Sequence, residues 1–188
     1  MKPQLTLIAA MDENRLLANE HGIPWHLPRD VAHFREYTKD KWLLLGRRTF
    51  EEMRGWFRTG HVPLVLTRQK HDRGKGILPL SEQGQDALAT NPLRTVATIE
   101  EALTLAAQAG QTALVCCGGA QVFSAALPHA DRLVLTLVQA AFPPGKNPVY
   151  FPQWSPFEWT IISESYYPSD ADNACAMRLI TLARTKIC

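Results

Sequence analysis

The sequence predicts an α/β protein whose central sheet is largely parallel. Apolar runs of strand length alternate with helical segments along the chain, and this alternation is typical of such layered folds. The 188 residues are 46% hydrophobic and 20% charged, so the chain can bury a core of ordinary domain size. We see no internal repeat or low-complexity tract in it. We therefore expect a single domain over residues 1–188.

The first strand is expected close to the N-terminus. Residues 5–11 are mostly apolar, and the polar run 12–15 ends the strand. The alternative interpretation is the core of a signal peptide, but this stretch is at the lower limit of length for that role and is too short to span a bilayer. Residues 16–27 contain glycine and proline, and we expect them to be irregular.

A helix, a strand and a second helix are predicted next. Pro28 suits the first turn of a helix that continues over residues 29–37. The apolar run 42–46 predicts a buried strand. Thr49 and Glu52 are three residues apart, which is the spacing of a capping box, so we expect a short helix to open at Thr49.

The middle of the chain contains a strand, a long connection and another capped helix. Residues 62–67 predict a strand in which Pro63 lies where the sheet needs no N–H donor. Residues 68–94 predict a long connection or an insertion that holds at most a short strand. Thr98 and Glu101 form a second capping box in front of an alanine-rich helix.

Four further strands are expected in the C-terminal part, with one more helix among them. The helix follows Gly118-Gly119 and continues through Leu127. The strands are predicted at residues 113–117, 132–138, 157–165 and 175–183. The turn-forming run 168–173 indicates that the last two strands pair as an antiparallel hairpin at one edge of the sheet.

Charge and cysteine content exclude several functional classes. The net charge of +2 and the pI of about 8.4 are too small to indicate a nucleic acid or an anionic membrane as the partner. Cys116 and Cys117 are adjacent, whereas Cys175 and Cys188 are isolated, which is neither a disulfide framework nor a zinc module. The histidines lack metal-ligand spacing. We expect a cytoplasmic monomer without a metal.

Three predicted strands end in residues suited to phosphate. These ends are Gly46–Thr49 with two arginines, Thr67-Arg68, and Gly118–Gln121 with two glycines. Ligands of open α/β sheets bind beyond the carboxyl ends of the strands. A glycine before a helix is by itself usually only a turn, but the three together predict an anionic ligand with several phosphates. A dinucleotide with an extra 2′-phosphate fits, although the Gly-x-Gly-x-x-Gly fingerprint of standard Rossmann domains is missing.

Asp30 is the most informative ionisable residue, and two interpretations of it stay open. One is that it lies in an apolar cleft near Phe34, where burial adjusts its proton affinity. The other is that it only favours the helix dipole from the first turn. Trp25 is similarly either a core aromatic or a site residue.

In their order and spacing, several short motifs closely resemble bacterial dihydrofolate reductase. They are Leu7-Ile-Ala-Ala10, Pro24-Trp25-x-Leu-Pro-x-Asp30, Gly46-Arg-x-Thr49, Gly118-Gly119 and Leu135-Thr136. The resemblance implies a single-domain dihydrofolate-reductase-like fold, with a central, mainly parallel eight-stranded sheet, a C-terminal antiparallel hairpin and helices on both faces. It also implies that NADPH and 7,8-dihydrofolate bind in one cleft, with reduction by hydride transfer.

The resemblance further assigns roles to individual residues. Asp30 would hold the pterin, with Thr136 supporting it and Trp25 positioning a water. The substrate-binding residues would be Ile8, Ile23, Val31, Phe34, Met53, His61 and Cys117. The cofactor-binding residues would be Ala10, Leu17, Gly46, Arg47, Arg48, Thr49, Thr67, Arg68, Gly118, Gly119, Gln121, Val122 and Phe123.

Three departures from the family pattern affect the mobile loop and the folate tail. Ala18 stands where the family usually has glycine, and Asn147-Pro148 replaces an acidic residue that often fastens the closed loop. His61 stands where the family has the arginine that clamps the glutamate tail, so we expect tail recognition to be weakened or taken over by Arg58 or Arg54. Two alternatives are a reductase acting on another pterin or pyrimidine, and a non-catalytic NADPH or pterin binding protein.

Overall fold

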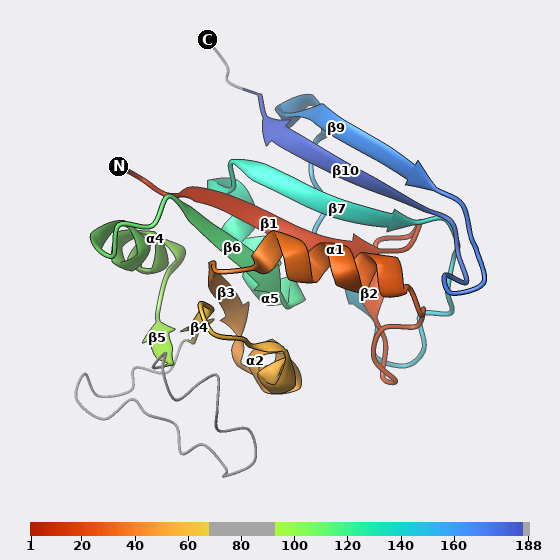
Figure 1. The fold of residues 1–188 in the computed structure, drawn as a ribbon, viewed down its shortest axis with the longest axis horizontal. Coiled ribbons are helices and arrows are strands. Elements are labelled where there is room, and N and C mark those ends of the chain that lie inside the picture. The colour runs from red at the N-terminus through yellow and green to blue at the C-terminus, as the bar shows by residue number, and fades with distance from the viewer. Residues whose placement is uncertain (68–92, 186–188) are drawn as a thin grey trace. The chain divides into compact units, whose positions relative to one another are not determined.

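The computed structural model describes residues 1–67 and 93–185 (Figure 1). Within these ranges, eight strands form one mainly parallel sheet with an antiparallel C-terminal hairpin, which confirms the predicted fold class. Contacts divide the chain into two compact units. The first unit contains Met1–Leu5 and Thr38–His129, and the second contains Thr6–Tyr37 and the chain from Ala130 onward. Most of the predicted connection 68–94 falls outside the described residues.

The strands of the first unit run parallel in the order β5-β4-β3-β6. They are β3 (Trp42–Gly46), β4 (Val62–Leu66), β5 (Arg94–Val96) and β6 (Ala113–Gly118). Three of the predicted strands are thereby confirmed. Pro63 pairs with Leu43 on the β3 side, whereas the β5 ladder begins only at Leu64. The proline therefore lies beyond the end of the β5 ladder, as its missing N–H requires.

Helices of the first unit pack on these strands. They are α2 (Arg47–Glu52), η1 (Arg54–Trp56), α4 (Ile99–Gln108), α5 (Ala120–Ala126) and η2 (Leu127–His129). The Thr98 hydroxyl accepts the Glu101 N–H at 3.1 Å, so the second capping box is confirmed. The first one is wrong: α2 begins two residues before Thr49, and Gly46 occupies the N-cap without a side-chain bond.

The second unit has the strand order β1-β7-β10-β9. These strands are β1 (Gln4–Met11), β7 (Arg132–Val138), β9 (Trp159–Tyr167) and β10 (Met177–Arg184). β7 pairs parallel with β1 and antiparallel with β10, and β10 pairs antiparallel with β9. The predicted edge hairpin is therefore confirmed. The short antiparallel pair β2 (Leu16–Ala18) and β8 (Val149–Tyr150) was not predicted.

Besides its strands, the second unit contains α1 (Pro28–Thr38) and the short turn η3 (Pro156–Glu158). Leu27, Val138 and Met177 form a buried cluster at the start of α1, and Trp25 and Phe142 pack against it. Thr38 is the buried residue of α1, whereas its apolar side chains Val31 and Phe34 stay half-exposed. The helix therefore leaves part of its apolar face available to a ligand. Within the described ranges, each helix is too short or too polar to cross a membrane.

Candidate functional site

In the second unit, Asp30 and Thr136 form a hydrogen-bonded pair. Asp30 lies in the first turn of α1, and the buried Thr136 lies in β7. The Thr136 hydroxyl donates to Asp30 Oδ1 over 2.6 Å. Burial raises the pKa of the Asp30 carboxyl, and the Thr136 hydroxyl and the nearby His33 counteract only part of that effect. The pair is thus a partly buried carboxylate with one oriented donor.

Local sequence explains how both side chains reach this place. Val31 donates its N–H to the Leu27 carbonyl at 3.2 Å, which starts α1, and Pro28 fits the first turn because it needs no acceptor. In β7, Thr136 pairs with Ala10 of β1 on one side and Leu179 of β10 on the other. Both earlier interpretations of Asp30 are therefore compatible with its position: it lies in the first helical turn, and its carboxylate is also held by a second element.

Several other residues that the resemblance assigned to the substrate also belong to the second unit. Ile8 is buried in β1, Val31 and Phe34 are half-exposed, and Ile23 is 64% exposed. The Trp25 ring lies 5.4 Å from that of Phe142, so it is anchored in the core by one aromatic contact while remaining half-buried.

A carboxylate that the sequence analysis missed joins two loops of the second unit. Glu20 Oε2 accepts the backbone N–H of Lys146 at 2.8 Å and that of Asn147 at 3.4 Å. Hydrogen bonds from the backbone N–H groups of Glu20, Lys146 and Asn147 lower the pKa of the Glu20 carboxyl. A carboxylate is therefore present between the loops, although residues 147–148 supply none. The contact was missed because nothing in the local sequence relates positions so far apart.

In the first unit, two glycines form a cradle at the ends of β3 and β6. A Cβ on Gly46 would lie 3.2 Å from Val122 Cγ2, and one on Gly119 would lie 3.3 Å from Thr49 Oγ1. Both glycines are N-caps without a side-chain bond, at the starts of α2 and α5. A side chain at either position would crowd Val122 or Thr49, so glycine leaves the backbone at both helix starts without a side chain. This is the feature that a phosphate-bearing cofactor needs, so the residues fit NADPH.

Gly118 is glycine for a conformational reason. Its φ is +107°, and a Cβ there would lie 2.9 Å from Phe123 Cε2. The Gly118–Gly119 peptide bond is cis. Arg47 and Arg48 are exposed at the start of α2, next to the cradle in the chain. The predicted phosphate sites at Gly46–Thr49 and Gly118–Gln121 therefore come together within the first unit.

The remaining predicted cofactor and substrate residues lie in various environments. Val122 and Phe123 are buried, Gln121 is exposed, and Ala10, Leu17, Met53, Thr67 and Cys117 are half-buried. Arg68 lies outside the described residues.

Burial raises the pKa of Cys116 to about 12 and that of Cys117 well above its usual range, so neither thiol ionises near neutrality. Among residues 1–67 and 93–185, no three metal-ligating side chains cluster.

The His61 side chain is buried within the first unit. It is only 9% exposed, and its Nδ1 accepts the Arg58 N–H at 3.0 Å. Burial lowers the pKa of His61, and a hydrogen bond to the Thr38 backbone opposes this only partly. The Arg58 guanidinium donates to the carbonyls of Gly55 and Phe57 at 2.9 and 3.0 Å. His61 and Arg58 thus already have partners within the first unit.

Comparison with known proteins gives a consistent family. A family model described as dihydrofolate reductase matches residues 4–184. Dihydrofolate reductase type 3 of Salmonella typhimurium is 30% identical over 97% of this chain and 99% of its own length. The dihydrofolate reductase of Haemophilus influenzae is 30% identical over 95% and 98% of the two chains. A solved dihydrofolate reductase from Enterococcus faecalis, complexed with NADP(H) and RAB-propyl, superposes with a TM-score of 0.75 at 27% identity, covering 97% of each chain.

Proposed function

The chain belongs to the dihydrofolate reductase family, and we propose on that basis that it reduces 7,8-dihydrofolate to 5,6,7,8-tetrahydrofolate with NADPH. The observation that carries the proposal is the Asp30 carboxylate, held by the Thr136 hydroxyl at 2.6 Å beside a half-exposed apolar helix face. An acceptor of this kind suits a flat heterocycle that has adjacent N–H donors and an apolar ring.

Asp30 binds and orients the pterin. Its two oxygens accept from N3 and the 2-amino group of the pterin, because a carboxylate matches two parallel donors. Thr136 fixes the carboxylate, so the fork is oriented before substrate arrives. The negative charge also favours protonation of N5, which accompanies reduction at C6. Val31 and Phe34 cover the apolar ring.

The glycine cradle of the first unit holds the cofactor. Gly46 and Gly119 let the phosphates approach the backbone, and Thr49 lies beside the cradle with a hydroxyl to donate. Arg47 and Arg48 add charge complementary to the 2′-phosphate. When bound, NADPH supplies the hydride, and the protein supplies orientation and electrostatics. We further infer a single-domain enzyme of the cytoplasm, because the cysteine spacing supports no disulfide framework.

Substitution of Asp30 tests this proposal. In Asp30→Asn, we expect turnover of dihydrofolate to fall by about a hundredfold or more at neutral pH, because the fork and its charge are lost. The loss should be smaller in acid, where N5 is protonated without help. Affinity for NADPH should stay unchanged. Asp172→Asn, which removes an exposed carboxylate of the same unit, is the matched control.

The measurement is the fall in NADPH absorbance when protein, cofactor and dihydrofolate are mixed, with NADPH affinity measured separately. Full activity of Asp30→Asn at neutral pH would rule out the role assigned to the carboxylate. Tight NADPH binding without turnover in the unsubstituted protein would favour a non-catalytic binding protein instead.

A second candidate is a reductase that recognises the pterin but holds the glutamate tail weakly. It is favoured by one observation. His61 is buried and its Nδ1 already accepts a hydrogen bond, so its imidazole cannot act as the bidentate clamp that an arginine provides. Comparing dihydrofolate with a dihydropterin that lacks the glutamate tests it. Similar kcat/KM values for the two would support this candidate, and a strong preference for dihydrofolate would contradict it.

A further inference from the structure

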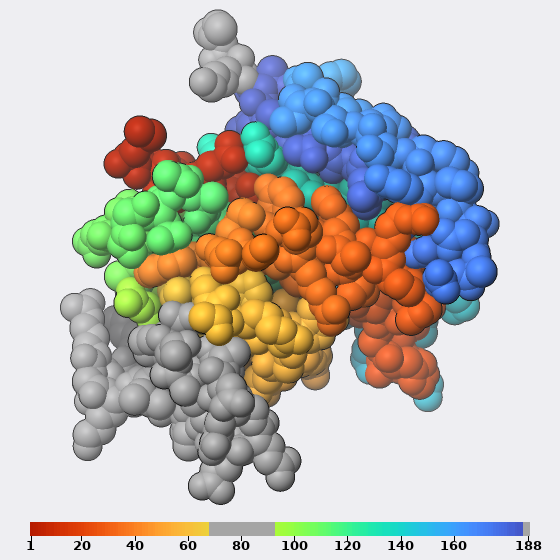
Figure 2. Space-filling view, in the orientation of Figure 1, coloured from red at the N-terminus to blue at the C-terminus, as the bar shows by residue number. Residues whose placement is uncertain are grey.

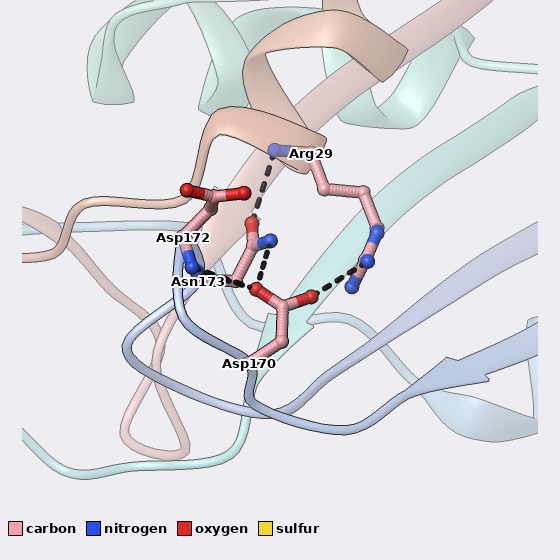
Figure 3. Close-up of polar contacts among 4 residues, drawn as sticks. All are labelled: Arg29, Asp170, Asp172 and Asn173. Atoms are coloured by element: carbon pink, nitrogen blue, oxygen red, sulfur yellow. Dashed lines mark hydrogen bonds and ion pairs between the residues drawn. The ribbon is translucent and has the colours of Figure 1, made fainter.

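The first turn of α1, which carries Asp30, has no capping side chain of its own. Leu27 precedes the helix, and its apolar side chain offers no acceptor. Pro28 has no N–H. The next N–H, that of Arg29, donates to Asn173 Oδ1 at 3.1 Å, although Asn173 is 144 residues away in the connection between β9 and β10 (Figure 3). The cap therefore comes from a distant loop.

Asp170 fixes which way the Asn173 amide points. Asn173 is 4% exposed, and its Nδ2 donates to Asp170 Oδ1 at 2.8 Å. The same oxygen accepts the backbone N–H groups of Asn173 and Asp172, at 2.8 and 3.0 Å. These bonds, that of the Asn173 side chain first, lower the pKa of Asp170 to about 2. Since Nδ2 must face this carboxylate, Oδ1 must face the helix.

An ion pair joins the same two segments more weakly. The Arg29 guanidinium donates to Asp170 Oδ2 at 2.8 Å and lies 4.9 Å from the centre of the Tyr167 ring. The two charged side chains are 35% and 38% exposed, so solvent screens the pair. Figure 2 shows the orange surface of α1 meeting the blue surface of the β9–β10 connection. The buried amide is the firmer of the two links.

We propose that Asn173 is a positioning residue for Asp30. It holds the first turn of α1 from the β9–β10 connection, while Thr136 holds the carboxylate from β7. Asp30 is the next residue after the capped N–H, so fraying of this turn would move the carboxylate away from Thr136. The role rests on the proposed function of Asp30, because it is exerted through that residue. A misplacement of about 1 Å at an active site can reduce the rate by about a hundredfold, so a smaller shift of Asp30 should cost less than that.

Three variants separate this role from general stabilisation. Asn173→Ala removes the cap, and we expect kcat for dihydrofolate to fall roughly tenfold with an unchanged KM for NADPH. Arg29→Met removes the ion pair but keeps the N–H, and Asp172→Asn changes the charge of the loop without touching the cap. We expect both to stay within about twofold of the parent, as is usual for exposed charges.

Two measurements on the ligand-free protein accompany the kinetics. Hydrogen exchange of the Arg29 amide should become about tenfold faster in Asn173→Ala, because its acceptor is gone. The carboxyl carbon of Asp30, followed by NMR, should titrate at higher pH, since the Thr136 hydroxyl and the helix N-terminus both favour the carboxylate. The charged neighbours His33 and Arg29 are unchanged in this variant. If the alanine variant does not fold, Asn173→Ser provides a milder loss in the same direction.

The possible outcomes distinguish the positioning role of Asn173 from the proposed function of the protein. Parent-like exchange at Arg29 together with parent-like titration of Asp30 in Asn173→Ala would overturn the proposal. A loss of kcat in Arg29→Met equal to that in Asn173→Ala would overturn it as well, because the ion pair would then be the effective link. If the parent protein reduces no dihydrofolate, the proposed function fails, whereas exchange and titration still decide whether Asn173 positions Asp30.

Discussion

Replacing Thr136 by valine tests how strongly the hydroxyl holds Asp30. The substitution keeps the shape of a side chain that is only 3% exposed and removes the donor of the 2.6 Å bond. A hydrogen bond to an ionised group contributes about 1.5–3 kcal/mol, so we expect Thr136→Val to lower the free energy of unfolding by about that amount at neutral pH. Urea denaturation measures this change directly.

The pH dependence of this loss identifies its source. The Thr136 bond lowers the pKa of Asp30 in the folded state, so the stabilisation it provides is present above that pKa and is lost as pH falls through it. The difference between the parent and Thr136→Val should therefore narrow from about pH 7 to about pH 4. In an Asp30→Asn background the acceptor is neutral, and the same substitution should cost only about 0.5–1.5 kcal/mol.

Burial of Asp30 predicts a second effect of pH on stability, opposite in sign to that of the Thr136 hydrogen bond. Because burial outweighs the hydroxyl and keeps the folded pKa above its ordinary value, ionising Asp30 costs stability as pH rises through that range. Asp30→Asn should consequently unfold at an equal or higher temperature than the parent at neutral pH. A cost of Thr136→Val that is below about 0.5 kcal/mol, or one that is the same at both pH values, would refute the reasoning.

Three further predictions concern other parts of the two units. Gly119→Ala should weaken NADPH binding about tenfold in a fluorescence titration, since its Cβ fills the cradle 3.3 Å from Thr49 Oγ1, while Gly55→Ala, with open space around it, should bind normally. Glu20→Gln should speed hydrogen exchange at the Lys146 amide and leave the melting temperature nearly unchanged, and unchanged exchange would show that the carboxylate holds no loop. Because burial lowers the pKa of His61, protonation in acid should destabilise the protein below about pH 6.5, and His61→Gln should remove part of this dependence in melting curves.

Sequence predicted the strands and the hairpin well because their signals are local. Apolar runs such as residues 42–46 and 132–138 can be recognised without knowing their partners, and the structure has strands at both. The capping box at Thr49 was wrong because glycine at position 46 already starts the helix at the end of β3. A Cβ at position 46 would lie 3.2 Å from Val122 Cγ2, which is a tertiary contact that the capping-box pattern does not include.

The candidate site was predicted only in part, because some of its residues belong to recognisable motifs whereas others depend on distant contacts. Gly118 was expected from its sequence context, and its positive φ explains why no other residue fits there. The contacts of Glu20 and Asn173 could not be predicted, because each joins positions more than a hundred residues apart and neither residue belongs to a recognisable local motif. His61 was expected at the folate tail, yet its orientation depends on burial against Phe57 and on the Arg58 backbone. The sequence showed that a histidine stands at position 61, but it did not show how that side chain is oriented.

The division of the chain into units has a consequence for biosynthesis. The second unit is built from Thr6–Tyr37 and from the chain after Ala130, whereas most of the first unit is the continuous stretch between them. A ribosome therefore releases Asp30 early, but Thr136 and Asn173 emerge 106 and 143 residues later. Until then the helix that carries the carboxylate lacks both its capping partner and its donor. The first unit, by contrast, has nearly all of its sequence available before the second can be completed. A truncation after Ala130 would therefore remove Thr136 and Asn173, the two partners of the helix that carries Asp30, while leaving the glycine cradle encoded in full.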